Sequence, residues 1–279
     1  MTREYEALLD QGIAWYQNGS YTEAEKAFFT CAEAQNNSLA YSYLGDMYLY
    51  GIGHGVNKAV ARSFYEQAIK APQPVPVAFY QLAMLTNTST REGRQEYIDL
   101  LEQAGQRNFA PAHTALAREL MAGNLVPKMP EEAIRLYKMA ISQGDACAMY
   151  ELADYYLRRD PSRSHLEEAF DYMMAAAEAG HPEALLYIGQ LYANSYNDEV
   201  AIECWQRAAE AGNADAYYRL GYLAELGRAG AVNMADCYAR SAIKGFDLAE
   251  EKCRELGIAV TIIHPDGSKK VVDFVHRFP

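Results

Sequence analysis

A short motif of small and apolar residues, A-x-x-x-[LI]-[GA], recurs along the chain at intervals of 32 to 38 residues. Its copies are Ala40–Gly45, Ala78–Ala83, Ala112–Ala117, Ala148–Ala153, Ala184–Gly189 and Ala216–Gly221, with a looser copy at Ala7–Gly12. A fixed period in this range is the signature of proteins built from stacked repeats. The motif therefore predicts a solenoid, an architecture that presents an extended surface rather than one deep catalytic pocket.

A second pattern, small-x-x-bulky-bulky-x-x-small, alternates with the first. It begins at Ala24, Ala61, Tyr97, Ala133, Ala169, Ala201 and Met234. Apolar residues at i, i+3, i+4 and i+7 form one face of an α-helix, so each repeat is predicted to be a helix, a loop and a second helix. Small residues let the two helices approach closely, and bulky residues fill the space between them. We predict an all-α, right-handed α/α superhelical solenoid of about seven helix-turn-helix repeats over residues 1–257.

The loop of the second repeat is rich in glycine and reads YGIGHGVNKAVARSFYEQA over Tyr50–Ala68. Two later junctions read AAAEAGHPEA, at Ala175–Ala184, and RAAEAGNADA, at Arg207–Ala216. Together these segments closely resemble the Sel1-like repeat family over residues 39–257, and residues 4–36 resemble a tetratricopeptide repeat. The resemblance implies a tetratricopeptide-like solenoid that acts as a non-catalytic scaffold or adaptor.

Glycine and proline mark the junctions between the predicted helices. Five glycines at predicted helix ends fit left-handed caps, and they are Gly105, Gly144, Gly180, Gly212 and Gly245. Pro72, Pro74 and Pro76 cannot continue a helix, so they predict an extended junction between the second and third repeats.

The pattern changes from helical to strand-like after residue 257. The β-branched segments VTII and VVDFV flank the turn sequence PDG. Residues 258–279 are therefore predicted to form a small extended tail or a β-hairpin over 259–275. A lone hairpin is marginal in water, so we expect it to cap the last repeat.

The chain is acidic, with a net charge of −12. A surface of this sign argues against nucleic-acid binding and favours a basic partner, although solubility alone explains it equally well. The sequence contains no run of 18 apolar residues, so it predicts no transmembrane helix. The start MTREYEALLDQ lacks the basic segment followed by an apolar segment that is typical of a signal peptide. We therefore expect a cytoplasmic protein with no membrane insertion.

The sequence carries no motif of catalysis or of cofactor binding. No nucleophile elbow, phosphate loop or C-x-x-C pair is present, and the six histidines lack i, i+4 pairing. Cys31, Cys204 and Cys237 lie at pattern positions of the second helices and are expected to be small buried thiols. We expect no enzyme activity, no metal and no cofactor.

In tetratricopeptide-like solenoids the first helix of each repeat lines the concave face, through positions −3, +1 and +4 relative to the consensus Gly or Ala. Carried over from the resemblance, these positions mix Tyr, Met and Leu with a few charges, among them Asp46 and Glu225. Such a mixture is typical of a protein interface. The residues predicted to bind a partner are Tyr80, Met84, Arg118, Tyr150, Asp154, Tyr218 and Tyr222. The alternative is that the same positions are buried between neighbouring repeats.

The favoured function is a scaffold or adaptor that binds a protein or peptide on the concave face. A narrower alternative is a cytoplasmic immunity protein that neutralises a basic secreted bacterial toxin, because the chain is acidic. A small-ligand-binding or enzymatic repeat protein is less favoured, since no nucleophile with a base is evident. Self-association through exposed tyrosines and the tail stays open, and the sequence identifies neither the partner nor the oligomeric state.

Overall fold

The computed structural model of the 279-residue chain describes residues 2–159, 162–263 and 269–273, and the side chains of residues 3–159, 162 and 165–258. The chain separates into two compact units, unit 1 (Met1–Asp145) and unit 2 (Ala146–Pro279). The two units are described separately below.

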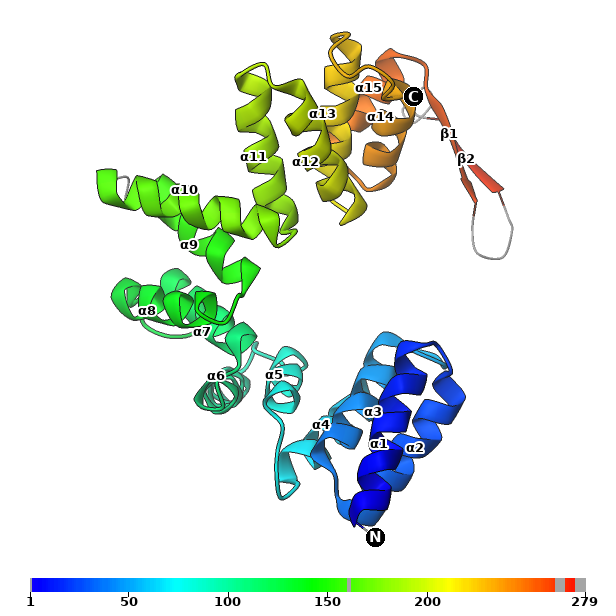
Figure 1. The fold of residues 1–279 in the computed structure, drawn as a ribbon, viewed down its shortest axis with the longest axis vertical. Coiled ribbons are helices and arrows are strands. Elements are labelled where there is room, and N and C mark those ends of the chain that lie inside the picture. Colours follow the sequence, from blue (N-terminus) through cyan, green and yellow to red (C-terminus); the bar gives the residue numbers. More distant parts are fainter. Residues whose placement is uncertain (1, 160–161, 264–268, 274–279) are drawn as a thin grey trace. The chain divides into compact units, whose positions relative to one another are not determined.

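Unit 1 consists of helices that pack on their neighbours in the sequence. Its helices are α1 (Thr2–Gln17), α2 (Tyr21–Gln35), α3 (Ser38–Tyr50), α4 (Lys58–Lys70), α5 (Pro76–Met84), α6 (Arg91–Gln106), α7 (Ala110–Ala122) and α8 (Pro130–Ile141). They form four hairpins, α1–α2, α3–α4, α5–α6 and α7–α8, and each hairpin also contacts the next one (Figure 1).

Unit 2 continues the same arrangement. Its helices are α9 (Ala146–Arg159), α10 (Arg163–Glu178), α11 (Pro182–Asn194), α12 (Asp198–Glu210), α13 (Ala214–Glu225), α14 (Met234–Ile243) and α15 (Asp247–Glu255). Strands β1 (Ala259–Ile263) and β2 (Lys269–Asp273) follow and pair antiparallel, with Ala259 opposite Asp273. The PDG turn lies outside the described residues, so the capping role of the tail stays a prediction.

The helix-turn-helix solenoid is confirmed for the helical part of both units, because every helix packs on its chain neighbours within its unit. The right-handed superhelical sense and the domain boundary at residue 257 stay predictions. Asparagine side chains begin several helices: Asn37, Asn57, Asn213 and Asn233 each accept a hydrogen bond from the backbone N–H three residues later. Such caps satisfy N–H groups that have no partner inside the helix.

Four of the five predicted glycine caps adopt the left-handed conformation. Gly144, Gly180, Gly212 and Gly245 have φ between 84° and 98°. The prediction is wrong for Gly105, because α6 continues to Gln106 and the left-handed residue is Asn108, with φ 60°. Gly105 is needed for close packing instead: a Cβ there would lie 3.0 Å from Cδ2 of His113.

The last residue of the repeated motif faces the second bulky residue of the following helix. A Cβ added to Gly45 would lie 2.5 Å from the ring of Tyr65, and one added to Gly189 would lie 2.5 Å from the indole of Trp205. Both rings are buried. Glycine is therefore required here for helix-to-helix approach rather than for an unusual backbone angle.

Buried tyrosines use their hydroxyls as well as their rings. The Tyr65 hydroxyl donates to Asp46 Oδ1 at 2.6 Å, and the Tyr238 hydroxyl donates to Glu225 Oε2 at 2.5 Å. Burial raises the pKa of Asp46, whereas the bonds from Tyr238 and Lys252 lower the pKa of Glu225. Burying a hydroxyl without a hydrogen-bond acceptor would cost stability. Each buried tyrosine therefore needs a carboxylate on the first helix of its hairpin, and its hydrogen bond holds that carboxylate in place.

The three pattern cysteines are buried, as predicted: Cys31, Cys204 and Cys237 all lie in the core as free thiols. Burial raises the pKa of the Cys237 thiol to about 11. These thiols therefore act as small apolar side chains.

Candidate functional site

The first helices of the repeats carry all seven residues predicted to bind a partner. In unit 1 these helices are α1, α3, α5 and α7, and in unit 2 they are α9, α11, α13 and α15. In each unit, we call the surface that these helices present the first-helix face. Three predicted residues belong to unit 1 and four belong to unit 2, so the structure does not unite all seven in one site.

In unit 1, Tyr80 and Met84 lie one turn apart on α5. Tyr80 is half-buried, with its ring edge-on to Phe109 at 5.5 Å, and Met84 is 42% exposed. Arg118, on α7, is exposed. Burial raises the pKa of the Tyr97 phenol on α6; the Glu119 charge and the Tyr80 hydroxyl add to this shift, and the Arg118 charge opposes it. Tyr80 and Arg118 thus both influence Tyr97, and Met84 lies one turn further along α5.

In unit 2, Tyr150 and Asp154 lie one turn apart on α9. The Tyr150 ring stacks on the imidazole of His181 with centroids 4.5 Å apart. The Arg158 Nε atom donates to Asp154 Oδ1 at 2.5 Å. Burial raises the pKa of Tyr150, and the charges of Asp154 and Glu183 raise it further. The surroundings of Tyr150 are therefore acidic, but part of its ring is already covered.

Tyr218 and Tyr222, on α13, both line a groove in unit 2. Their rings are nearly parallel, with centroids 6.4 Å apart. Tyr218 also contacts Phe246 and Tyr238, at centroid distances of 5.2 and 5.6 Å. Tyr222 is 47% exposed. One tyrosine is therefore anchored in the unit while the other is available to a partner.

This α13 groove has a volume of about 580 Å³ and lies within unit 2. It is lined by Gln190, Ala193, Asn194, Trp205, Asp215, Tyr218, Arg219, Tyr222, Leu223, Leu226, Arg228, Phe246 and Leu248. Tyr222, Leu226 and Leu248 are each about half exposed. Large exposed apolar side chains gathered at one groove are typical of an interaction site.

The two arginines of the α13 groove are held by carboxylates. Arg219 forms a two-point ion pair with Asp215, at 3.0 and 3.1 Å, and also donates to Gln190 Oε1. Arg228 forms a second such pair with Asp198, at 2.9 and 2.5 Å. Because both guanidinium charges are already neutralised, the groove offers apolar and aromatic contact rather than a free positive charge.

Sequence reasoning found Tyr218 and Tyr222 but missed Phe246 and Leu248. These two residues belong to α15 and the residue before it, beyond the sixth motif copy at which the predicted positions ended. One more copy of the motif, starting at Ala249, would place positions −3, +1 and +4 at Glu251, Glu255 and Ile258, so the period alone does not find Phe246 and Leu248. Asp46 and Glu225, by contrast, occupy predicted positions but serve the buried tyrosines Tyr65 and Tyr238.

The repeats match a family model along more than half of the chain. The Sel1 repeat model matches residues 38–72, 110–145, 148–181, 182–213 and 214–241. The chain belongs to the Sel1 repeat family. Members of this family are tetratricopeptide-like solenoids, which agrees with the helical hairpins of both units. Residues 73–109, which contain Pro74, Pro76, α5 and α6, lie between two matched segments.

Similar proteins come from several organisms. An uncharacterized protein of Neisseria meningitidis is 29% identical over 156 residues, which make up 54% of this chain and 32% of that protein. A Sel1 repeat protein from Oxalobacter formigenes is 25% identical, with a TM-score of 0.68 over 88% of this chain and 99% of its own. An immunity protein from Pseudomonas aeruginosa is 24% identical, with a TM-score of 0.50 over 69% and 74% of the two chains. The last likeness shows the fold alone.

This Sel1 repeat chain spans only 26 to 32% of the length of the curated relatives that it matches. Among the described helices, none is both long and apolar enough to cross a bilayer. Within the described residues no three His, Cys, Asp or Glu side chains are grouped so as to hold a metal ion.

Proposed function

We propose that this Sel1 repeat protein is a non-catalytic scaffold or adaptor that binds a protein or peptide on its first-helix face. The observation that carries the proposal is the α13 groove, where Tyr218 and Tyr222 meet the exposed apolar side chains of Leu226 and Leu248. Tyrosine and large apolar side chains form the energetic centres of many interfaces. The family supports the same role, because Sel1 repeats generally serve protein interaction.

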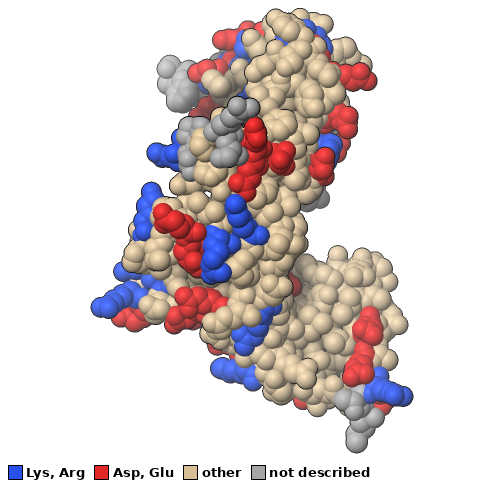
Figure 2. Space-filling view, turned by 60° about the vertical axis from the view of Figure 1, so that its left-hand side comes forward, with Lys and Arg blue, Asp and Glu red and all other residues tan. Residues whose placement is uncertain are grey.

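The charge of unit 2 favours a basic segment in the partner. Residues 146–257 contain 10 Lys and Arg against 19 Asp and Glu, a net charge of −9. Residues 1–145 contain 12 against 16, a net charge of −4. Figure 2 shows acidic and basic side chains next to one another in small mixed groups, with wide uncharged areas between the groups. The net negative charge of these residues would steer a basic partner toward the unit without supplying most of the affinity.

Replacing Tyr222 and Leu226 by alanine tests the groove. Both side chains are about half exposed, so the double variant should keep the thermal stability of the wild type. Affinity capture from the host, followed by binding measurements on the captured protein, should show a loss of about tenfold or more, the size expected at an interface hot spot.

The matched control is Phe170→Ala. Phe170 is 49% exposed but belongs to α10, a second helix. The control should bind like the wild type. A partner held equally well by the Tyr222→Ala, Leu226→Ala variant would place binding elsewhere and refute the assignment to the α13 groove.

A second candidate function is an immunity protein that neutralises a basic secreted toxin. The acidity of residues 146–257 favours it, whereas the similarity to a Pseudomonas aeruginosa immunity protein concerns the fold alone. If electrostatic steering operates, reversing the charge at Asp154 with Asp154→Lys should slow association severalfold at low salt and hardly change it at high salt. Stopped-flow measurements on the captured partner would give both rates, and rates insensitive to salt in the wild type would contradict this function.

A further inference from the structure

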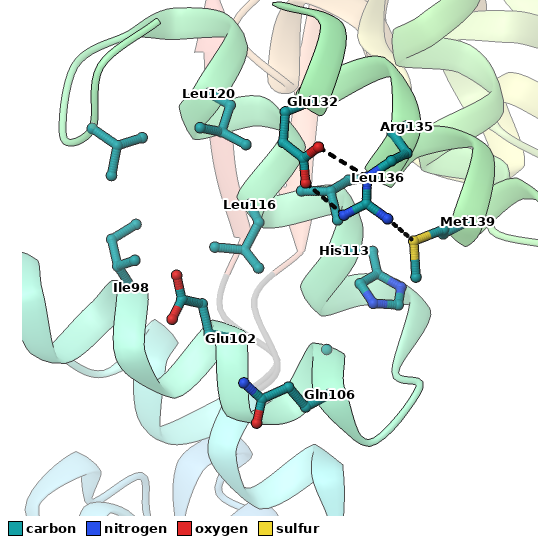
Figure 3. A pocket seen from close by; sticks show the side chains of 12 residues that line it. Ile98, Glu102, Gln106, His113, Leu116, Leu120, Glu132, Arg135, Leu136 and Met139 are labelled. Atoms are coloured by element: carbon teal, nitrogen blue, oxygen red, sulfur yellow. Dashed lines mark hydrogen bonds and ion pairs between the residues drawn. The ribbon is translucent and has the colours of Figure 1, made fainter. Parts of the chain in front are cut away.

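A second cavity lies within unit 1, and none of the seven predicted residues lines it. It has a volume of about 410 Å³ and opens between the second helices α6 and α8, above α7 (Figure 3). It is lined by Ile98, Glu102, Gly105, Gln106, His113, Leu116, Leu120, Val126, Glu132, Arg135, Leu136 and Met139. We call this space the α7 cavity. Its volume falls in the range of small-molecule sites, which is about 300–1,000 Å³.

The cavity coincides with a departure from the repeat pattern. His113 stands at the second position of the motif, where the other copies carry Tyr41, Phe79, Met149, Leu185 and Tyr217. The imidazole is buried and fits closely against Gly105 of α6. A smaller polar ring thus replaces a long or aromatic apolar side chain at the wall of the cavity.

His113 brings no charge to the cavity. The residue is only 3% exposed, and burial lowers its pKa; the hydrogen bond to the Gly105 carbonyl opposes this shift in part, and the Arg135 charge adds a smaller lowering effect. The Gln143 amide lies 3.5 Å from its Nδ1. The imidazole is therefore neutral at physiological pH and has neighbours for hydrogen bonding.

The charges of Glu132 and Arg135 cancel each other. Arg135 donates to both carboxylate oxygens of Glu132, at 2.9 and 2.5 Å, and its remaining arm contacts the Met139 sulfur at 3.3 Å. This fork-to-fork geometry satisfies both partners. The pair closes the α8 side of the cavity and leaves neither group to attract a ligand charge.

Glu102 and Gln106 are the polar residues of the lining whose side chains have no partner among the described residues. They lie one turn apart on α6, and Figure 3 shows both side chains on the cavity side of that helix. Neither forms a hydrogen bond or an ion pair within the described part of the chain. Glu102 is thus the one lining charge, among the described residues, without a countercharge.

We propose that the α7 cavity binds a small organic amine with one aryl or branched alkyl group. The ammonium group would donate to the Glu102 carboxylate and, once the Gln106 amide rotates, to its side-chain oxygen, which Figure 3 shows turned away from Glu102. The apolar group would fill the space among Leu116, Leu120 and Leu136. A cavity of about 150 Å³ suffices for a benzene ring, so this one holds a ring together with its aminoalkyl chain. The proposal is independent of partner binding at the α13 groove.

The test uses three probes of the same shape: 2-phenylethylamine, the neutral 2-phenylethanol and the anionic 3-phenylpropanoate. Each is titrated into the 279-residue chain with labelled methyl groups and followed by NMR. We expect the amine to shift the methyl signals of Leu116 and Met139, with a Kd on the order of 1 mM for so small a ligand. It should bind about threefold more tightly than the alcohol, which reflects one partly solvated ion pair, and the anion should bind most weakly.

Glu102→Gln is the decisive variant, because an exposed side chain can be changed without loss of the fold. It should abolish the preference for the amine over the alcohol while leaving the alcohol affinity unchanged. Glu92→Gln, on the same helix but outside the cavity lining, is the matched control and should keep the preference. Equal affinities for the amine and the alcohol, retention of the preference in Glu102→Gln, or no methyl shift at about ten times the expected Kd would each overturn the proposal.

Discussion

Replacing Gly189 with alanine is expected to destabilise unit 2 by about 3 kcal/mol, the upper range for overpacking a core. The added Cβ would lie 2.5 Å from Nε1 and 2.6 Å from Cδ1 of Trp205. Trp205 is buried and donates to the Leu186 carbonyl at 3.2 Å, so the indole has little room to move and would lose this bond. The strain exceeds the gain in helix propensity of about 1 kcal/mol. Urea unfolding followed by circular dichroism measures the difference.

Two further variants separate steric conflict from a general effect of glycine replacement. Gly55→Ala introduces a Cβ with no atom within 4 Å, at a φ that alanine tolerates, so it should be nearly neutral. Adding Trp205→Leu to Gly189→Ala should cost less than the sum of the single changes, because it recreates the Ala83 and Leu101 pair of the third repeat. A Gly189→Ala variant as stable as the wild type would show that α11 and α12 are not packed at the distance described.

The repeat period alone predicted the helical hairpins, because two apolar patterns of helical spacing alternate along the chain. It also predicted that small residues mark the helix contacts. It could not predict why some motif copies end in glycine and others in alanine. The structure accounts for three of the glycines, because Gly45, Gly189 and Gly221 each face a large aromatic ring at a distance that leaves no room for a Cβ, but the Ala117 copy also has an aromatic residue, Tyr137, at the corresponding position. At these three glycines the choice depends on a pair of residues, and the pairing is visible only when the helices are in place.

The candidate site was predictable only in part. The positions carried over from the tetratricopeptide-like resemblance selected Tyr218 and Tyr222, and both line the α13 groove. The same positions also selected Asp46 and Glu225, which instead accept hydrogen bonds from buried tyrosine hydroxyls. Periodicity predicts which face of a helix a residue occupies. It does not predict that a buried tyrosine hydroxyl will need that residue as its hydrogen-bond acceptor.

The role of Gly105 was mispredicted for a related reason. Its position near a junction resembled that of the capping glycines, but it lies inside α6 against His113. A glycine required by a neighbouring side chain and one required by a positive φ look identical in a sequence. The distinction matters here, because the contact between Gly105 and His113 forms one wall of the α7 cavity.

Replacing Phe28 with alanine is expected to cost about 3–5 kcal/mol, the usual range for removing a fully buried aromatic ring. Phe28 is completely buried, and its ring stacks on Tyr43 with centroids 4.7 Å apart and planes within 4°. It joins α2 to α3 in the core formed with Leu44 and Met47. Since each repeat of a solenoid contacts only its neighbours, the loss should stay local. Hydrogen exchange should therefore accelerate in α1–α4 and remain unchanged in α11–α15.

The adjacent Phe29 provides a control of the same residue type. Phe29 is half-buried and meets Phe64 edge-on at 5.8 Å, so Phe29→Ala should cost about 1–2 kcal/mol, in proportion to the smaller apolar area that it covers. The contrast between the neighbours separates core removal from any loss of apolar surface. Should Phe28→Ala instead accelerate exchange equally in both units, the chain would unfold as one cooperative body, and nearest-neighbour stability would not describe it.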